Sequence, residues 1–138
     1  MSRSAYVDTS AFYAYLVAAD GNHAAVSAWF VEAVRVGTSL FSSSFVFAET
    51  HGLLQIRHGR PAAAAFTEKV APRVEWRWVD DALLRRALVA HAEKPGRGFT
   101  LVDACGVVCV RDRPGSVCVA LDSDFEGRGF DVVPTTRK

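Results

Sequence analysis

Short apolar strand-like segments alternate with amphipathic helical segments along the whole chain of 138 residues. Parallel strands need long crossover connections, usually helices, so this alternation predicts an α/β fold with a mostly parallel central sheet and helices on both faces. We expect one domain, residues 1–138, because the length suits a single core and no linker or internal repeat interrupts it. The expected strands are 5–7, 39–42, 74–79, 116–121 and 130–133, and the expected helices are 9–17, 24–36, 45–57, 62–70, 81–92 and 101–110.

The bulk composition narrows the class of protein without naming a function. Half of the residues are hydrophobic and 22% are charged, which is typical of a globular protein and not of a disordered one. The net charge of +1 is too small to indicate a nucleic-acid partner by itself. Three cysteines, no apolar stretch of roughly 18–20 residues and no signal-peptide core predict a cytoplasmic protein without a membrane association.

Four acidic residues lie in apolar sequence surroundings. Asp8 ends the run Ala-Tyr-Val, Glu49 follows Phe-Val-Phe-Ala, Asp103 is the only charge in residues 99–110, and Asp122 ends Val-Cys-Val-Ala-Leu. Buried Asp and Glu side chains are rare unless they are paired or bind a metal ion. A single acid after a strand is usually a helix cap or a turn residue, but four such acids favour a shared site.

The expected secondary structure places these acids near one edge of the sheet. Asp8 and Asp122 follow strands, and ligand sites in open α/β sheets form at the carboxyl ends of strands. Asp103 and Glu49 lie near helix starts, and Asp124 is a further possible ligand. Clustered carboxylates repel one another without a cation, and their oxygens suit Mg²⁺ or Mn²⁺. Metal-assisted hydrolysis of a phosphodiester is the natural use of such a site.

The residues around these acids resemble the motifs of PIN-domain ribonucleases, specifically the VapC-type toxins, along nearly the whole chain. The motif at residues 6–10 is Tyr-Val-Asp-Thr-Ser, that at 47–49 is Phe-Ala-Glu, and that at 100–104 is Thr-Leu-Val-Asp-Ala. The closing motif is Ala-Leu-Asp-Ser-Asp-Phe at residues 120–125. One departure is Ala120, at a position where the family often has a hydroxyl residue; it removes one possible hydrogen bond but none of the acids.

The resemblance implies a PIN-like (Rossmann-like) domain and a metal-dependent endoribonuclease. Asp8, Glu49, Asp103 and Asp122 would bind Mg²⁺ or Mn²⁺, and Asp124 would support the metal or its water. The substrate would be RNA. The resemblance further implies a homodimer and a cognate antitoxin whose C-terminal segment blocks the active-site groove.

Two alternative functions share the same motifs. A PIN nuclease of ordinary RNA processing would have the same chemistry but no antitoxin, and a non-catalytic PIN scaffold would bind RNA or protein without cleaving it. The short length favours the toxin, and the complete set of acids argues against the scaffold.

Other candidate residues have simpler interpretations. The cysteines lack the spacing of a zinc site and are assigned to the core. The core assignment also covers the tryptophans and a helical stripe in residues 24–36. Five basic residues could hold RNA phosphates, but solvated charges at helix ends and in loops are the preferred interpretation of them. The five basic residues are Arg57, His58, Arg60, Lys94 and Arg97. The tryptophans are Trp29, Trp76 and Trp78. The helical stripe consists of Ala25, Trp29, Val31, Ala33 and Val36.

Overall fold

A five-stranded sheet, in which every pairing is parallel, forms the centre of the molecule. The computed structural model describes residues 3–134. The strand order is β3-β2-β1-β4-β5, so the first strand lies in the middle. This confirms the predicted α/β class with a parallel sheet. The strands are β1 Ser4–Val7, β2 Ser39–Ser43, β3 Glu75–Arg77, β4 Val117–Val119 and β5 Val132–Val133.

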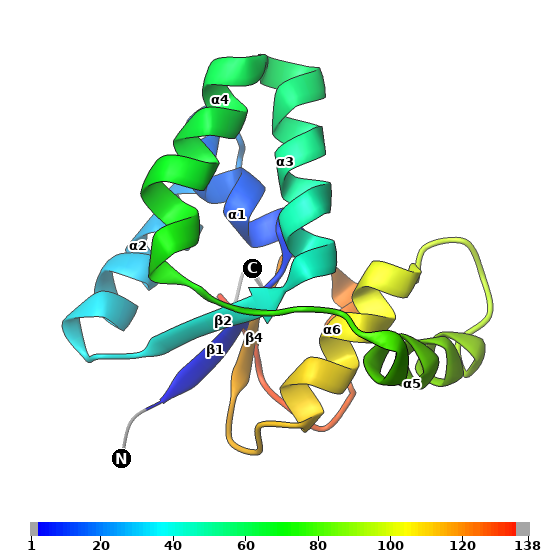
Figure 1. The fold of residues 1–138 in the computed structure, drawn as a ribbon. Coiled ribbons are helices and arrows are strands. Elements are labelled where there is room, and N and C mark those ends of the chain that lie inside the picture. Colours follow the sequence, from blue (N-terminus) through cyan, green and yellow to red (C-terminus); the bar gives the residue numbers. More distant parts are fainter. Residues whose placement is uncertain (1–2, 135–138) are drawn as a thin grey trace.

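Helices connect consecutive strands and pack on the sheet and on one another. In Figure 1, α3 and α4 rise as a hairpin on one side of the sheet, whereas α5 and α6 lie together on another. The predicted helix 62–70 is wrong in part, because the α-helix changes to a π-helical turn at Phe66 and then to a 3₁₀ turn. The helices are α1 Thr9–Leu16, α2 His23–Arg35, α3 Ser44–His58, α4 Arg60–Ala65, α5 Asp81–Ala92 and α6 Leu101–Arg111, with shorter turns η1 Phe66–Val70, η2 Ala71–Arg73 and η3 Ser123–Phe125.

The register aligns the carboxyl ends of β1 and β4. Val7 pairs with Val119, and the next backbone N–H, that of Asp8, donates to the Val119 carbonyl at 3.0 Å. The Ala120 N–H also donates to the Val133 carbonyl, so pairing continues just past β4. The segments after β1 and β4 therefore leave the sheet side by side, which places Asp8 near the chain that carries Asp122.

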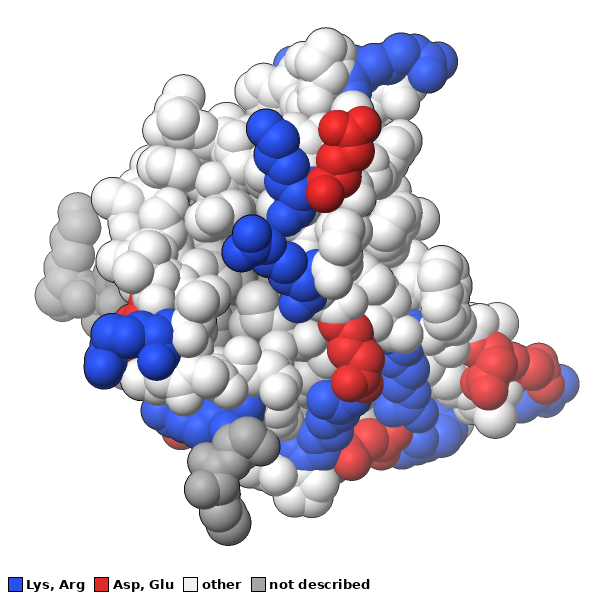
Figure 2. Space-filling view, turned by 60° about the vertical axis from the view of Figure 1, so that its left-hand side comes forward, with Lys and Arg blue, Asp and Glu red and all other residues white. Residues whose placement is uncertain are grey.

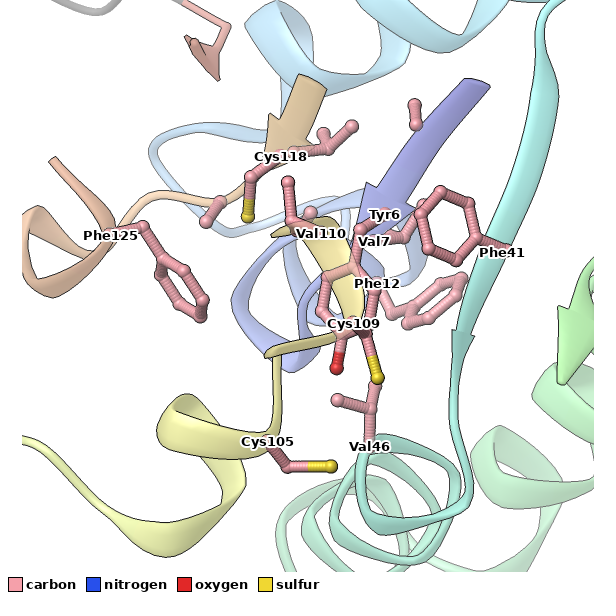
Figure 3. Packing of buried hydrophobic residues seen from close by; sticks show 14 of the residues in the cluster. Tyr6, Val7, Phe12, Phe41, Val46, Cys105, Cys109, Val110, Cys118 and Phe125 are labelled. Atoms are coloured by element: carbon pink, nitrogen blue, oxygen red, sulfur yellow. The ribbon is translucent and has the colours of Figure 1, made fainter. Parts of the chain in front are cut away.

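Aromatic and aliphatic side chains fill the space between the sheet and α6. Tyr6 is fully buried, its ring meets Phe41 edge-on at 5.6 Å, and its hydroxyl lies 3.1 Å from Ser43 Oγ. Figure 3 shows the cysteine sulfurs among these side chains. All three cysteines are free and buried, which agrees with their assignment to the core.

Two expectations about the core are wrong. In α2 the buried side chains are Val26, Phe30 and Ala33, whereas Val31 is 70% exposed, so the apolar stripe begins one residue later than expected. Trp78 is 71% exposed because β3 ends at Arg77 and the backbone leaves the sheet there. The alternation of apolar and polar residues in the sequence therefore extends beyond the part of β3 that pairs with β2.

Charged groups of both signs are interspersed on the surface. On the face shown in Figure 2, acidic and basic side chains lie next to one another. Within residues 3–134, no helix is long and apolar enough to cross a membrane. The small net charge thus reflects mixed charges, with ion pairs between neighbouring elements.

The ion pairs of Asp112, directly after α6, are expected to stabilise the fold in a pH-dependent way. Arg86 and Arg77 donate to its carboxylate at 2.7 and 2.6 Å, and together they lower the pKa of Asp112 from 3.8 to about 2. The folded-state pKa is depressed, so the stabilisation is present above pH 4 and is lost as pH falls through about 2. We expect Asp112→Asn to lower the free energy of unfolding by about 1 kcal/mol at pH 7, since the arginines are partly exposed.

Urea unfolding at pH 7 and at lower pH measures this effect, and the two proteins should converge toward pH 2. The control is Asp81→Asn, because the Asp81–Arg85 pair is about three-quarters exposed on both sides and should contribute little. Equal losses in the two variants would contradict the role assigned to Asp112.

Candidate metal centre

Asp8 lies at the junction of β1 and α1, and its side chain is 5% exposed. Asp8 is the N-cap of α1. Its Oδ2 accepts hydrogen bonds from the Ser10 backbone N–H at 3.1 Å and from the Ser10 hydroxyl at 2.6 Å. The carboxylate is thus held rigidly at the end of the central strand.

The Ser10 hydroxyl joins the two halves of the site. It donates to Asp8 and accepts a hydrogen bond from the backbone N–H of Leu121 at 3.0 Å. Leu121 precedes Asp122, so one hydroxyl fixes the segments after β1 and β4 relative to each other. The sequence indicated Ser10 only as an additional oxygen near Asp8.

Asp103 lies in the first turn of α6 and is 8% exposed. Thr100 and Asp103 form a capping box: the Asp103 N–H donates to the Thr100 hydroxyl, while Asp103 Oδ2 accepts from the Thr100 backbone N–H at 2.9 Å. The predicted cap at Thr100 is confirmed. The hydrogen bonds to Asp103 converge on Oδ2, as those to Asp8 do, so capping fixes the orientation of the carboxylate.

Asp122 begins the short turn η3 that follows β4. Its Oδ1 accepts from the Asp124 N–H at 2.9 Å. The strand itself ends at Val119, so Asp122 does not follow it directly as expected; Ala120 and Leu121 intervene. Asp124, in η3, forms an ion pair with Lys94 from the loop between α5 and α6.

The structure brings three of the predicted acids into one group and leaves two beside it. Asp103, Asp122 and Asp124 each offer a carboxylate oxygen, and these oxygens lie within 4.8 Å of one another. Asp8 and Glu49 lie outside that group but are close enough to interact electrostatically with Asp103. We call these five residues, Asp8, Glu49, Asp103, Asp122 and Asp124, the acidic cluster.

The premise that all the acids are buried is wrong for Glu49. Its side chain is exposed on α3, beside exposed Ala48, although the flanking sequence is apolar. In an amphipathic helix the neighbours in sequence point to different faces, so an apolar run does not bury every position. Glu49 nevertheless faces the other acids, because its charge raises the pKa of both Asp8 and Asp103.

The electrostatics of the acidic cluster favour a cation. Burial, opposed by the Ser10 hydrogen bonds, raises the pKa of Asp8 from 3.8 to about 6, and the charges of Asp103 and Glu49 add to this. Burial also raises the pKa of Asp103, with contributions from Asp122 and Glu49. In contrast, Lys94 holds the pKa of Asp124 below its ordinary value. Ionising several neighbouring carboxylates is unfavourable because their negative charges repel one another. A divalent cation bound between them would stabilise their ionised forms.

The donor set fits a hard divalent cation. Only carboxylate oxygens converge among the described residues of the group, and Mg²⁺ and Mn²⁺ prefer such ligands. A cavity of about 480 Å³ borders Asp122 and is lined by residues of the segment 120–134, among them Ser123 and Asp131. A larger apolar groove of about 610 Å³ lies elsewhere, between α1, α2 and η1. None of the five acids of the acidic cluster lines this groove.

Lys94 and Ser10 are the residues of the site whose role the sequence did not indicate. Lys94 was only one of five basic residues that could contact RNA, and nothing in its neighbourhood pointed to Asp124. Lys94 lies in a glycine-rich loop and contacts a residue 30 positions further along the chain. The loop sequence has no periodicity from which the path of its backbone could be predicted.

Comparisons with known proteins agree with this geometry. The family model of the PIN domain matches residues 5–130. The crystal structure of VapC20 from Mycobacterium tuberculosis, a sarcin-ricin loop cleaving toxin, is 29% identical, with a TM-score of 0.79 over 95% of this chain and 99% of that one. No curated protein sequence matches the chain.

Two further solved structures have the same fold at lower identity. VapBC2 from Rickettsia felis, bound to a DNA fragment from its promoter, is 9% identical with a TM-score of 0.67 over 94% of this chain and 97% of that one. FitAcB from Neisseria gonorrhoeae is 14% identical with a TM-score of 0.64 over 94% of this chain and 96% of that one. The predicted resemblance to VapC-type toxins is confirmed, and the chain belongs to the PIN domain family.

Proposed function

We propose that this chain, as a single PIN domain of residues 1–138, is a Mg²⁺- or Mn²⁺-dependent endoribonuclease that acts as the toxin of a toxin–antitoxin pair. The observation that carries the proposal is the convergence of Asp103, Asp122 and Asp124 within 4.8 Å, beside the buried Asp8. The likeness to VapC20, at 29% identity over nearly the whole chain, supports an RNA substrate.

We assign the metal ligands to Asp8, Glu49, Asp103 and Asp122. When bound, the cation would lower the pKa of a water molecule and neutralise charge on the phosphate. The protein contributes position: Ser10 and Thr100 each hold one carboxylate through two hydrogen bonds, and these bonds fix the orientation of Asp8 and Asp103 before substrate arrives. Asp124 would support the metal or its water in addition to these four ligands, although Lys94 already occupies one of its oxygens.

The partners follow from the same resemblance. We propose a cognate antitoxin that blocks the active-site groove, a homodimer, and a cytoplasmic location, for which three free buried cysteines are suited. Exposed apolar side chains, among them Ile56 on α3 and Val89 on α5, provide surface that an interface could cover.

Cleavage of a structured RNA by the purified protein tests the central proposal. We expect cleavage with Mn²⁺ or Mg²⁺ and loss of cleavage when EDTA removes the metal. Glu49→Gln should reduce the rate by at least about tenfold, because even partners of metal ligands typically contribute that much. The matched control is Glu68→Gln on η1, which lies outside the acidic cluster and should leave cleavage unchanged.

Growth arrest distinguishes the toxin from the other two functions. Expression in a bacterial host should arrest growth, and Glu49→Gln should relieve the arrest. Cleavage without arrest would favour a processing nuclease, and absence of both cleavage and Mn²⁺ binding would favour a non-catalytic scaffold.

A further inference from the structure

Asp124 is bound in a way that sets it apart from the other members of the acidic cluster. Its Oδ1 is ion-paired with the Lys94 ammonium, and its Oδ2 lies near Gly98 of the same loop, since a Cβ placed on Gly98 would be 3.5 Å from that oxygen. Asp124 therefore presents an already neutralised carboxylate to the site, whereas Asp103 and Asp122 have no lysine or arginine partner among residues 3–134.

Lys94 is itself held in place by an aromatic platform. Its ammonium lies over the Phe99 ring at 5.4 Å from the centroid, and Phe99 is 3% exposed. The His91 ring stacks on Phe99 with an interplanar angle of 9°, and the Arg128 guanidinium lies over the same ring at 4.2 Å. A lysine side chain that is already fixed by an ion pair and an aromatic ring loses little conformational entropy when it binds a phosphate. Such a lysine is therefore suited to act as a positioned cation.

The same platform fastens the loop before α6 to the segment after β4. Arg128 Nε donates to the Asp124 backbone carbonyl at 2.7 Å while its guanidinium packs on Phe99. The position of Lys94 is thus coupled to that of η3, the turn whose N-cap is Asp122. The Lys94 side chain stays 41% exposed, so a phosphate could reach it.

We propose that the Lys94 ammonium serves as the second cation of this site, in the place that a second metal ion would take, so that the enzyme works with one divalent ion. The inference rests on the proposed function. In two-metal hydrolases the ions lie about 3.5–4 Å apart and together hold the attacking and leaving oxygens. A second ion in this site would need Asp124, and it would have to displace Lys94. Asp124 is then a positioning residue for Lys94, and Lys94 faces the phosphate of the substrate.

Mn²⁺ titration by calorimetry, with free Mn²⁺ followed by electron paramagnetic resonance, tests this without any need for activity. We expect one Mn²⁺ per chain in the wild type. Lys94→Met keeps the length of the side chain but removes its charge, and should add a second, weaker site. The double variant Lys94→Met with Asp124→Asn should return to one Mn²⁺, because the freed carboxylate is gone. Lys69→Met, on η1, is the matched control and should bind as the wild type does.

Kinetics supply the second readout. Lys94→Met should lower kcat roughly a hundredfold with a smaller change in KM, as is typical when one charged group that stabilises the transition state is removed. Lys94→Arg should restore part of the rate because it keeps the charge.

Each outcome of the titration separates the inference from the proposed function. Two Mn²⁺ per wild-type chain, or a Lys94→Met variant that stays at one, would overturn the role of Lys94 and leave the nuclease assignment intact. A wild-type chain that binds no Mn²⁺ would overturn both.

Discussion

Asp8→Asn is expected to abolish RNA cleavage and, at the same time, to make the metal-free protein more stable. The loss of activity should be at least about a hundredfold, since residues that only orient metal ligands already contribute 10–100-fold. Asn retains an oxygen that can accept from Ser10, so the cap of α1 survives while the charge needed to bind a cation is lost.

The gain in stability follows from the raised pKa of Asp8. In the folded, metal-free protein this pKa is about 6, above the ordinary 3.8, chiefly because the carboxylate is buried. A raised folded-state pKa means that the fold is favoured at low pH and loses stability as pH rises through about 6. Each tenfold change in proton affinity corresponds to about 1.4 kcal/mol, so a pKa raised from 3.8 to about 6 means that the neutral amide should stabilise the protein by about 3 kcal/mol at pH 8.

Thermal or urea unfolding in EDTA at pH 8 and pH 4.5 measures the effect. The difference between variant and wild type should be large at pH 8 and small at pH 4.5. With saturating Mn²⁺ the order should reverse, because only the wild type gains binding energy from the ion. A variant that is less stable than the wild type at pH 8 without metal would contradict the electrostatic account of the site.

Gly106→Ala is expected to cost about 1–3 kcal/mol, although alanine is the better helix former. Gly106 lies in α6, where an added Cβ would come within 3.0 Å of Tyr6 Cε1 and 3.1 Å of Phe125 Cε1. Both rings are fully buried in the packing shown in Figure 3, and neither can shift without disturbing its own neighbours. The ring of Phe125 also holds η3, so metal affinity should fall together with stability.

Gly52→Ala is the matched control for this substitution. Gly52 also lies within a helix, α3, but nothing is within 4 Å of the place where its Cβ would be. There the helix propensity should dominate and stabilise the protein by about 0.5–1 kcal/mol. Urea unfolding of the two variants compares them directly. If Gly106→Ala were stabilising as well, the contact between α6 and β1 would be looser than the structure indicates.

The order of the elements could be predicted from the sequence because periodicity and capping are local properties. The strands at β1, β2 and β4 and the cap at Thr100 lie where the pattern places them. Strand ends were less predictable, since pairing with a neighbour decides where a strand stops. Trp78 illustrates this: its alternation continues, but β3 has no partner beyond Arg77.

The site could be predicted in part for the same reason. Asp8, Asp103 and Asp122 stand next to elements whose ends meet at one edge of the sheet, so their proximity follows from topology. Glu49 was predicted as a site residue because the residues before it are apolar, but its side chain is exposed in the structure. Lys94 reaches Asp124 through an irregular loop, and no local pattern encodes that contact.

The hydroxyl of Ser10 spans 111 positions of the chain when it accepts the Leu121 N–H. A growing polypeptide carries Asp8 and Ser10 long before the segment around Leu121, which completes their hydrogen bonds, has been made. Contacts of such long sequence separation form late in folding. A chain that stops before Leu121 cannot form this hydrogen bond, so we expect it to lack the assembled acidic cluster.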